Sequence, residues 1–234
     1  MAHLPLFRDF AVSLAFVVSL GQAQAQALHE GDVEMSVVGG KIVLDGYAVT
    51  QFGSGFKVFE GDFGDLAGGP FKTDDPGYDS EIGTFTSGTK VSYNTVGSLQ
   101  FWNGTGWGQA GMERVRLDGN LGEESFFSGT GISGALAGLV GQAGVGGVVH
   151  EHLDMTLSRI GAGVPAVGAY MFQLYLSGDG LVASDSFLMV INQGLEEEAF
   201  EMSVQALAVP EASTWLMLLA GVGLIGTVTA RRRV

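Results

Sequence analysis

The chain has 234 residues with 25 acidic but only 11 basic side chains, so its formal net charge is −14 at neutral pH. This charge argues against nucleic acid as a partner, because nucleic-acid binding needs cationic side chains that displace counterions from phosphates. It favours solubility and the binding of cations instead. The chain contains no cysteine, so disulfides are excluded and stability must come from a packed core or a bound metal.

A signal peptide is predicted over residues 1–27. Arg8 precedes an apolar run from Phe10 to Leu20, and small and polar residues follow up to Ala27. The apolar run has 11 residues, fewer than the roughly 20 needed to cross the hydrocarbon core of a bilayer. Two small-x-small cleavage sequences place the start of the mature chain at Gln26 or Leu28. The N-terminus therefore predicts an exported protein.

The last 26 residues, 209–234, have three parts. Val209-Pro210-Glu211 comes first, the stretch 215–230 then lacks any ionisable side chain, and Arg231-Arg232-Arg233 follows. A helix over 215–230 would span about 24 Å, which is marginal for a bilayer. The arginines should remain cytoplasmic by the positive-inside rule, so the body of the chain should lie outside the inner membrane.

This three-part tail resembles the PEP-CTERM sorting signal, with Ala212 in place of the usual second proline. The resemblance implies processing by an exosortase-type enzyme in a Gram-negative bacterium that makes exopolysaccharide. The protein is then expected in the periplasm, the outer envelope or the extracellular matrix. Its attachment to the inner membrane through the C-terminal helix would be transient, and exopolysaccharide would be a candidate partner.

The body, residues 28–208, is long enough to form one domain that buries about 70% of the unfolded chain's surface. Short apolar runs alternate with period two and are separated by glycine or aspartate turns, as in the pair 33–38 and 41–44 around Gly39-Gly40. This pattern predicts a mainly-β fold, an antiparallel β-sandwich or a jelly-roll-like domain. Further strands are expected at residues 56–60, 90–93, 99–102, 113–117, 153–160, 169–177, 187–191 and 200–206.

Two stretches fit this pattern poorly. Residues 129–147 are rich in glycine and alanine, and they are compatible with a flexible loop, a short helix or a glycine-rich strand. Residues 61–84 are expected to form a long acidic loop.

The histidines carry the most informative pattern of the body. In a strand, His150, His152 and Asp154 would point to one face, with roughly 6.6 Å between alternate Cα atoms. Two imidazoles at this spacing can converge on one zinc ion, with a carboxylate beside them. If the first strand pairs beside this one, His29 would be the third nitrogen ligand, and Asp32, Asp154 or water the fourth. The competing interpretation is a pair of surface histidines, or histidines that hydrogen-bond to loop backbone.

A second group of hard oxygen donors lies in residues 73–81. Asp74, Asp75, Asp79 and Glu81 fall within eight positions, and Ca²⁺ prefers such ligands. The spacing is not that of an EF-hand loop. A weak calcium site and a solvated acidic turn therefore remain as alternatives.

The body also resembles an exported PEP-CTERM family described as repressed by the zinc-uptake regulator. The resemblance covers most of the mature chain in collinear order and implies a role in zinc capture or homeostasis. Its segments are His29-x-x-Asp32 before the opening hairpin, Thr73-Asp74-Asp75-Pro76-Gly77-Tyr78-Asp79-Ser80 with Gly83-Thr84-Phe85, Phe101-Trp102-Asn103-Gly104, His150 to Leu157, and Asp185-Ser186-Phe187 to Ile191-Asn192-Gln193-Gly194-Leu195.

The sequence thus favours a non-enzymatic envelope protein that binds zinc. One alternative is a structural or carbohydrate-interacting matrix domain, with Tyr93, Trp102 and Trp107 as exposed stacking platforms. The favoured interpretation of these three aromatic residues is that they fill the core. The other is a cupin-like metalloenzyme, because Gly144 precedes His150-x-His152 at the spacing of that pattern. The glutamate that a cupin needs four or five positions later is missing, since Thr156 and Leu157 stand there.

Overall fold

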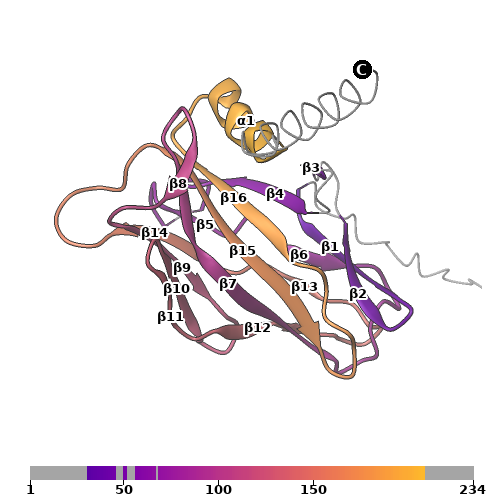
Figure 1. Cartoon of the computed structure of the whole chain (residues 1–234). Coiled ribbons are helices and arrows are strands. Elements are labelled where there is room, and N and C mark those ends of the chain that lie inside the picture. Colours follow the sequence, from indigo (N-terminus) through magenta and orange to yellow (C-terminus); the bar gives the residue numbers. More distant parts are fainter. Residues whose placement is uncertain (1–30, 46–49, 52–55, 67, 209–234) are drawn as a thin grey trace, which may run out of the picture.

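The computed structural model describes residues 31–45, 50–51, 56–66 and 68–208 (Figure 1). The predicted signal peptide 1–27, His29 and the sorting tail 209–234 lie outside the described residues. Within the described part of the chain, no helix is long and apolar enough to cross a bilayer. The elements form a mainly-β fold of three sheets with one short α-helix, so the predicted fold class is confirmed.

The largest sheet has seven strands, and its central members are long. All its pairings are antiparallel except that of β16 with β4. Its strands, in spatial order, are β12 (Ala137–Gln142), β7 (Lys90–Trp102), β15 (Gly168–Gly178), β16 (Phe187–Gln193), β4 (Lys57–Asp62) and β3 (Thr50–Gln51), with β8 (Trp107–Gln109) paired to β7.

A five-stranded antiparallel sheet faces it across the core. Its order is β11 (Gly131–Gly134), β10 (Glu124–Ser128), β9 (Glu113–Asp118), β14 (Met155–Arg159) and β5 (Lys72–Thr73). The third sheet has four strands, β13 (His150–Glu151), β6 (Tyr78–Ser80), β1 (Val33–Val38) and β2 (Lys41–Asp45). Its β1–β6 pairing is parallel, so the domain is not purely antiparallel.

The main core forms because side chains alternate between the two faces of each strand. Tyr170, Phe172 and Leu174 of β15 point into it and are fully or almost fully buried. Phe172 meets Phe127 of the five-stranded sheet with ring centroids 4.7 Å apart. The intervening side chains of β15 and β16 point to the opposite face of the seven-stranded sheet, where Val190 belongs to a second apolar cluster.

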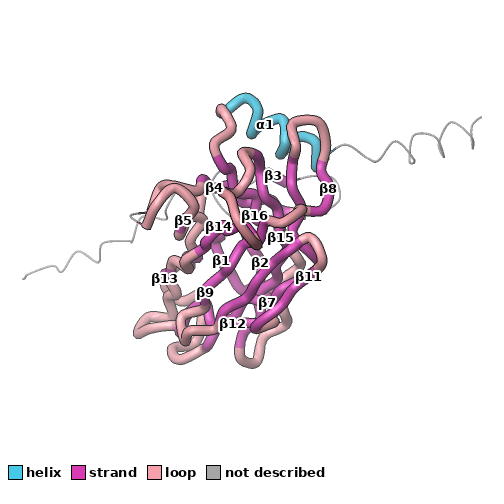
Figure 2. Tube along the Cα trace, turned by 90° about the vertical axis from the view of Figure 1, so that its left-hand side faces the viewer, coloured by secondary structure: helices cyan, strands magenta, loops and turns pink. Residues whose placement is uncertain are grey.

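That second cluster is covered by helix α1 (Glu197–Gln205), which continues into the 3-10 turn η1 (Ala206–Ala208). Figures 1 and 2 show α1 at one end of the domain, beside β8 and β16. The strand expected over residues 200–206 is therefore wrong. Phe200 and Val204 are four residues apart, so they share one helical face and are buried, whereas Met202 is exposed.

The stretches that did not fit the pattern also contain strands. Residues 129–147 include β11 and β12, which corresponds to the glycine-rich strand among the alternatives. The long loop expected over residues 61–84 is partly wrong, because the short strands β5 and β6 interrupt it. The two strands expected at 90–93 and 99–102 are one continuous strand, β7, with Gly97 at a positive φ of 75° within it.

Phe200→Ala should destabilise the domain, because it removes the largest side chain that α1 inserts against the sheet. A buried Phe→Ala change costs about 3 kcal/mol, or roughly 6–12 °C in melting temperature for a domain of this size. Thermal unfolding followed by circular dichroism measures this. Met202→Ala on the exposed face of the same helix is the matched control and should change the melting temperature little. Equal losses in the two variants would contradict the assigned orientation of α1.

Candidate metal centre

The two histidines of the His-x-His sequence are placed by a very short strand. His150 and Glu151 form β13, which pairs antiparallel with β6 so that His150 lies opposite Asp79. His152 follows after the strand has ended, and β6 separates β13 from β1. The direct pairing of β1 with the strand that carries His150, on which the expected role of His29 depended, therefore does not occur.

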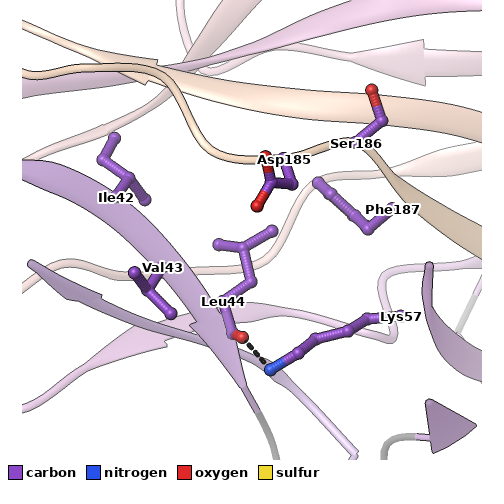
Figure 3. Close-up of a pocket in the computed structure, with 7 residues that line it drawn as sticks. All are labelled: Ile42, Val43, Leu44, Lys57, Asp185, Ser186 and Phe187. Carbon is purple, nitrogen blue, oxygen red and sulfur yellow. Dashed lines mark hydrogen bonds between the residues drawn. The ribbon is translucent and has the colours of Figure 1, made fainter. Parts of the chain in front are cut away.

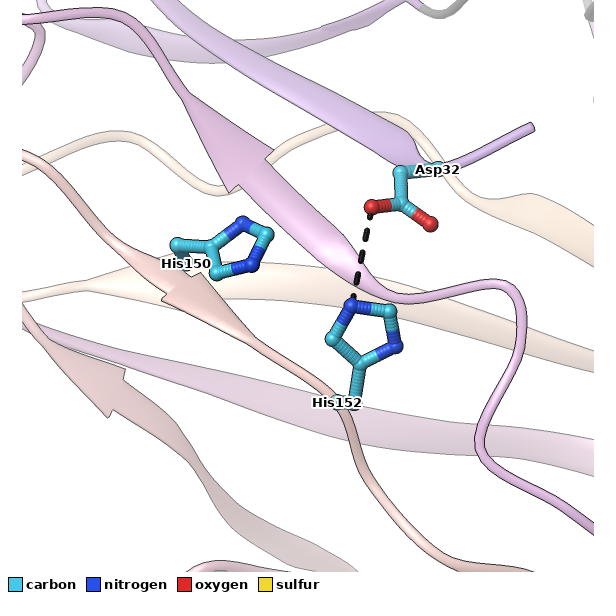
Figure 4. A group of neighbouring side chains, drawn as sticks. All are labelled: Asp32, His150 and His152. Atoms are coloured by element: carbon cyan, nitrogen blue, oxygen red, sulfur yellow. Dashed lines mark ion pairs between the residues drawn. The ribbon is translucent and has the colours of Figure 1, made fainter. Parts of the chain in front are cut away.

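Asp32 nevertheless reaches the histidines from the start of β1. Its carboxylate Oδ1 accepts a hydrogen bond of 2.8 Å from the Gly77 N–H, and the Val33 N–H donates to the Gly77 carbonyl at 2.9 Å. Asp32 is only 4% exposed. Its other oxygen, Oδ2, lies 3.9 Å from Nε2 of His152, as Figure 4 shows. The paired backbone of residues 32–33 and 77 thus holds this carboxylate at the histidines.

The other nitrogen of His152 is engaged on the opposite side of the ring. Nδ1 lies 3.1 Å from the Asp74 carbonyl oxygen and 3.1 Å from Oδ1 of Asp75. Both atoms are acceptors, so they favour the tautomer with the proton on Nδ1. The lone pair of that tautomer is on Nε2, the nitrogen that faces Asp32. Many metal-binding histidines are oriented in this way, by a carbonyl or carboxylate on the nitrogen that does not bind.

His150 has a similar arrangement. Its Nδ1 lies 3.4 Å from Oδ1 of Asp79, a residue only 2% exposed whose Oδ1 also accepts the Ser80 N–H at 2.7 Å. The rings of His150 and His152 are 5.4 Å apart between centroids, at an interplanar angle of 73°. One ligand atom from each of Asp32, His150 and His152 can be chosen so that all three lie within 4.8 Å of one another. These three side chains can therefore share one metal ion.

A second group of potential ligands uses the other side of His152. Asp74, Asp75 and His152 also offer ligand atoms within 4.8 Å of one another. Asp75 is 54% exposed at its side chain, whereas Asp32 is buried. An ion at this position would take Nδ1, the nitrogen already oriented by a carbonyl oxygen. The group around Asp32 is therefore the stronger candidate.

The other predicted site residues are placed as follows. Asp154 is exposed and belongs to neither group, because the chain leaves β13 after Glu151 and strand alternation is not maintained. The four residues of the predicted calcium loop separate: Asp74 and Asp75 flank His152, Asp79 contacts His150, and Glu81 is exposed beyond β6. Sequence reasoning did not identify Gly77, whose N–H binds Asp32, or Glu34, which lies opposite Asp79. The only signal for Gly77 was an Asp-Pro-Gly turn. The only signal for Glu34 was a single acidic residue in an apolar strand.

Further carboxylates adjoin the histidines on the four-stranded sheet. Glu34 of β1 is opposite Asp79 on one side and Asp45 on the other. Burial raises the pKa of Glu34, and the carboxylates of Glu81, Asp45 and Asp79 raise it further, in that order. Lys57 acts in the opposite direction and lowers it. The centre is therefore strongly negative, which favours a cation.

A cavity elsewhere on the surface is less suited to binding a ligand. A cavity of about 120 Å³ lies between β2 and the start of β16, lined by Leu44, Lys57 and Asp185 among others (Figure 3). Its charged groups are already committed, because Lys57 donates to the Leu44 carbonyl and Asp185 pairs with Lys41 at 2.8 Å.

The aromatic side chains considered as stacking platforms are not exposed. Tyr93 is fully buried in the main core, and Trp102 is buried in the second cluster. Trp107 packs against Trp102 at 5.7 Å and donates its indole N–H to the Ser203 carbonyl at 2.8 Å. The alternative of exposed platforms is therefore wrong, and the favoured interpretation that these aromatics fill the core is confirmed, because they pack in the main core and beneath α1.

The fold and the centre together define a mainly-β domain with a histidine–aspartate cluster, followed directly by the tail. Residues 208–233 match the PEP-CTERM protein-sorting motif. This motif marks the chain as an exported, envelope-associated protein of a Gram-negative bacterium that an exosortase-type enzyme sorts. No curated protein and no solved structure matches the chain.

Gly77→Ala should weaken metal binding with little effect on folding. A Cβ at this position would lie 2.6–2.8 Å from ring atoms of His152, so the ring must shift from its present position beside Asp32. We expect a loss of zinc affinity on the order of 10-fold, comparable to the loss of an orienting partner. Competition with a chromophoric chelator measures it. Gly106→Ala, whose Cβ would meet nothing within 4 Å, is the control; equal affinities for the two variants would contradict the geometry.

Deleting residues 209–234 should abolish sorting without abolishing export, because the predicted signal peptide remains and the matched motif is lost. In the native host, immunoblots of membrane and soluble fractions should show the truncated chain only in soluble fractions. Thr214→Ser, a conservative change within the tail, should behave as the wild type. A truncated chain distributed like the wild type would show that the tail does not direct sorting.

Proposed function

We propose that the chain is a non-enzymatic zinc-binding protein of the cell envelope, with His150, His152 and Asp32 as ligands. The observation that carries the proposal is the approach of their three ligand atoms to within 4.8 Å of one another. Two imidazoles and one carboxylate suit zinc, which binds histidine nitrogen at about 2.0–2.1 Å and carboxylate oxygen at similar distances. A water molecule or His29 would complete a four-coordinate ion.

The partners of the two histidines support this assignment. Asp75 and the Asp74 carbonyl hold Nδ1 of His152, and Asp79 lies beside Nδ1 of His150. The ring of His152 is thereby oriented through Nδ1, so that its Nε2 is suited to bind the ion, and the Asp79 carboxylate lies 3.4 Å from Nδ1 of His150. Carboxylates behind ligating histidines also raise the basicity of the ligand and strengthen binding.

A role in metal capture outside the inner membrane fits both the charge and the sorting motif. Without the predicted signal peptide and tail, the body carries 23 acidic and 7 basic residues. Such an excess of negative charge raises the local concentration of cations. The resemblance of the body to the family repressed by the zinc-uptake regulator points to the same metal.

The full chain, purified in a mild detergent and stripped with a chelator, should take up one zinc ion at neutral pH. His150→Ala combined with His152→Ala should abolish uptake, and Asp32→Asn should weaken it by about 10-fold or more because a charged ligand is lost. Elemental analysis and chelator competition measure both effects. Asp154→Asn, outside the cluster, is the control. Unchanged zinc stoichiometry in the double variant would refute the proposal.

Acidification should release the metal, because imidazole binds zinc only in its neutral form. The apparent zinc affinity of the wild type should therefore fall as the pH is lowered. The same titration also tests the donor type. A site made of carboxylates alone would retain its metal to lower pH.

A further inference from the structure

The turn between β5 and β6 connects the two groups of potential metal ligands. Asp74 and Asp75 lie at its beginning, and Gly77 at its end donates its N–H to the Asp32 carboxylate at 2.8 Å. His152 belongs to both groups, and in each group the ligand atoms lie within 4.8 Å of one another. A single imidazole ring thus lies between the Asp74–Asp75 pair and Asp32.

The two ring nitrogens of His152 face different groups. Nδ1 is 3.1 Å from Oδ1 of Asp75, whereas Nε2 is 3.9 Å from Oδ2 of Asp32, and Figure 4 shows Nδ1 on the side of the ring away from Asp32. Neutral imidazole has a proton on one nitrogen and a lone pair on the other, so the ring binds one ion at a time. Whichever nitrogen binds, the N–H of the other lies on the side of a carboxylate. His152 can therefore serve the two groups in turn.

The two groups differ in their access to solvent. The side chain of Asp75 is 54% exposed and Asp74 is half-buried, whereas Asp32 is only 4% exposed. A hydrated ion can therefore reach the Asp74–Asp75 pair more directly than it can reach Asp32. Clefts lined by one sign of charge also raise the local concentration of counter-ions and their association rate.

We propose that Asp74, Asp75 and His152 form an entry site, where a divalent cation binds in transit to the centre at Asp32, His150 and His152. The proposal rests on the zinc centre proposed above and adds the route by which that centre fills. The ion first binds the two carboxylates and Nδ1, while the ring proton is on Nε2. It then moves to Nε2, Asp32 and His150 as the ring proton moves to Nδ1, so no proton is gained or lost. The Nδ1–H then donates to the Asp74 carbonyl oxygen, which lies 3.1 Å away.

Stopped-flow kinetics of zinc binding by the chelator-stripped full chain, in a mild detergent, test the route. Mixing with zinc in the presence of a fluorescent chelator gives the association rate constant, and mixing the loaded chain with excess chelator gives the dissociation rate constant. Asp74→Asn removes a carboxylate of the entry site but leaves the backbone carbonyl that orients Nδ1. We expect both rate constants to fall by about 10-fold, the lower end of the effect of focused charge on association. The Kd should stay nearly unchanged, because losing an intermediate slows both directions equally.

Asp154→Asn is the matched control, because it removes the same charge two residues from His152 but belongs to neither group. It should leave both rate constants unchanged. Unchanged rate constants in Asp74→Asn would overturn the entry route while zinc binding itself stands. Slower association with an unchanged dissociation rate constant would overturn it too, since that result indicates long-range attraction alone.

Failure of the wild type to bind zinc would refute the zinc centre and the route together, so the two failures are distinguishable. If Asp74→Asn fails to fold, Asp75→Asn replaces it, because that side chain is the more exposed of the pair. Undiminished association in Asp75→Asn would overturn the route as well.

Discussion

Strand β6 holds the candidate metal centre together, because it pairs with β1 on one edge and with β13 on the other. Its three residues connect segments more than a hundred positions apart in the chain. Gly77, just before it, donates to Asp32 and packs against the ring of His152. A side chain at Gly77 would occupy the position of that ring. The backbone at this point therefore sets the distance between the carboxylate and the imidazole.

The distribution of charge explains why carboxylates gather beside the histidines on this sheet. The core behind it is apolar, with Tyr78 and Val33 fully or almost fully buried on the inner face. Strand alternation then leaves the outer face for Glu34 and Asp79. Carboxylates held this close together disfavour one another's ionised form, and a bound cation reverses that effect. The same alternation that builds the core thus concentrates negative charge beside the histidines.

Local sequence patterns predicted the central strands β15 and β16 well, because their nearly continuous apolar runs are typical of strands buried on both faces. These patterns failed where the same residues fit both the two-residue period of a strand and the 3.6-residue period of a helix. Phe200, Met202 and Val204 alternate as in a strand, but Phe200 and Val204 also share a helical face, and packing against the sheet decided for the helix. The three residues of β6 were too few to show a period. A strand this short forms because its neighbours supply both sets of hydrogen bonds.

The candidate metal centre likewise divides into residues that a local pattern reveals and contacts that depend on the pairing of distant strands. His150 and His152 were recognisable because they are adjacent in sequence, and Asp32 was among the expected ligands. The contribution of Asp79 depends on register between strands far apart in the chain, which no local pattern contains. Asp154 shows the converse, because it satisfies the local spacing but the strand ends before it. A ligand is therefore placed correctly from the sequence only where the length of the strand that carries it is predicted correctly.

The two ends of the domain separate attachment from binding. Helix α1 and η1 pack on the outer face of the seven-stranded sheet, and the PEP-CTERM motif begins at residue 208, where η1 ends. The histidine centre is built on the four-stranded sheet instead. In the sequence, therefore, no long linker stands between the folded domain and the motif. Because the helix next to the motif and the histidine cluster lie on different sheets, sorting at the tail does not require the face that carries the candidate metal ligands.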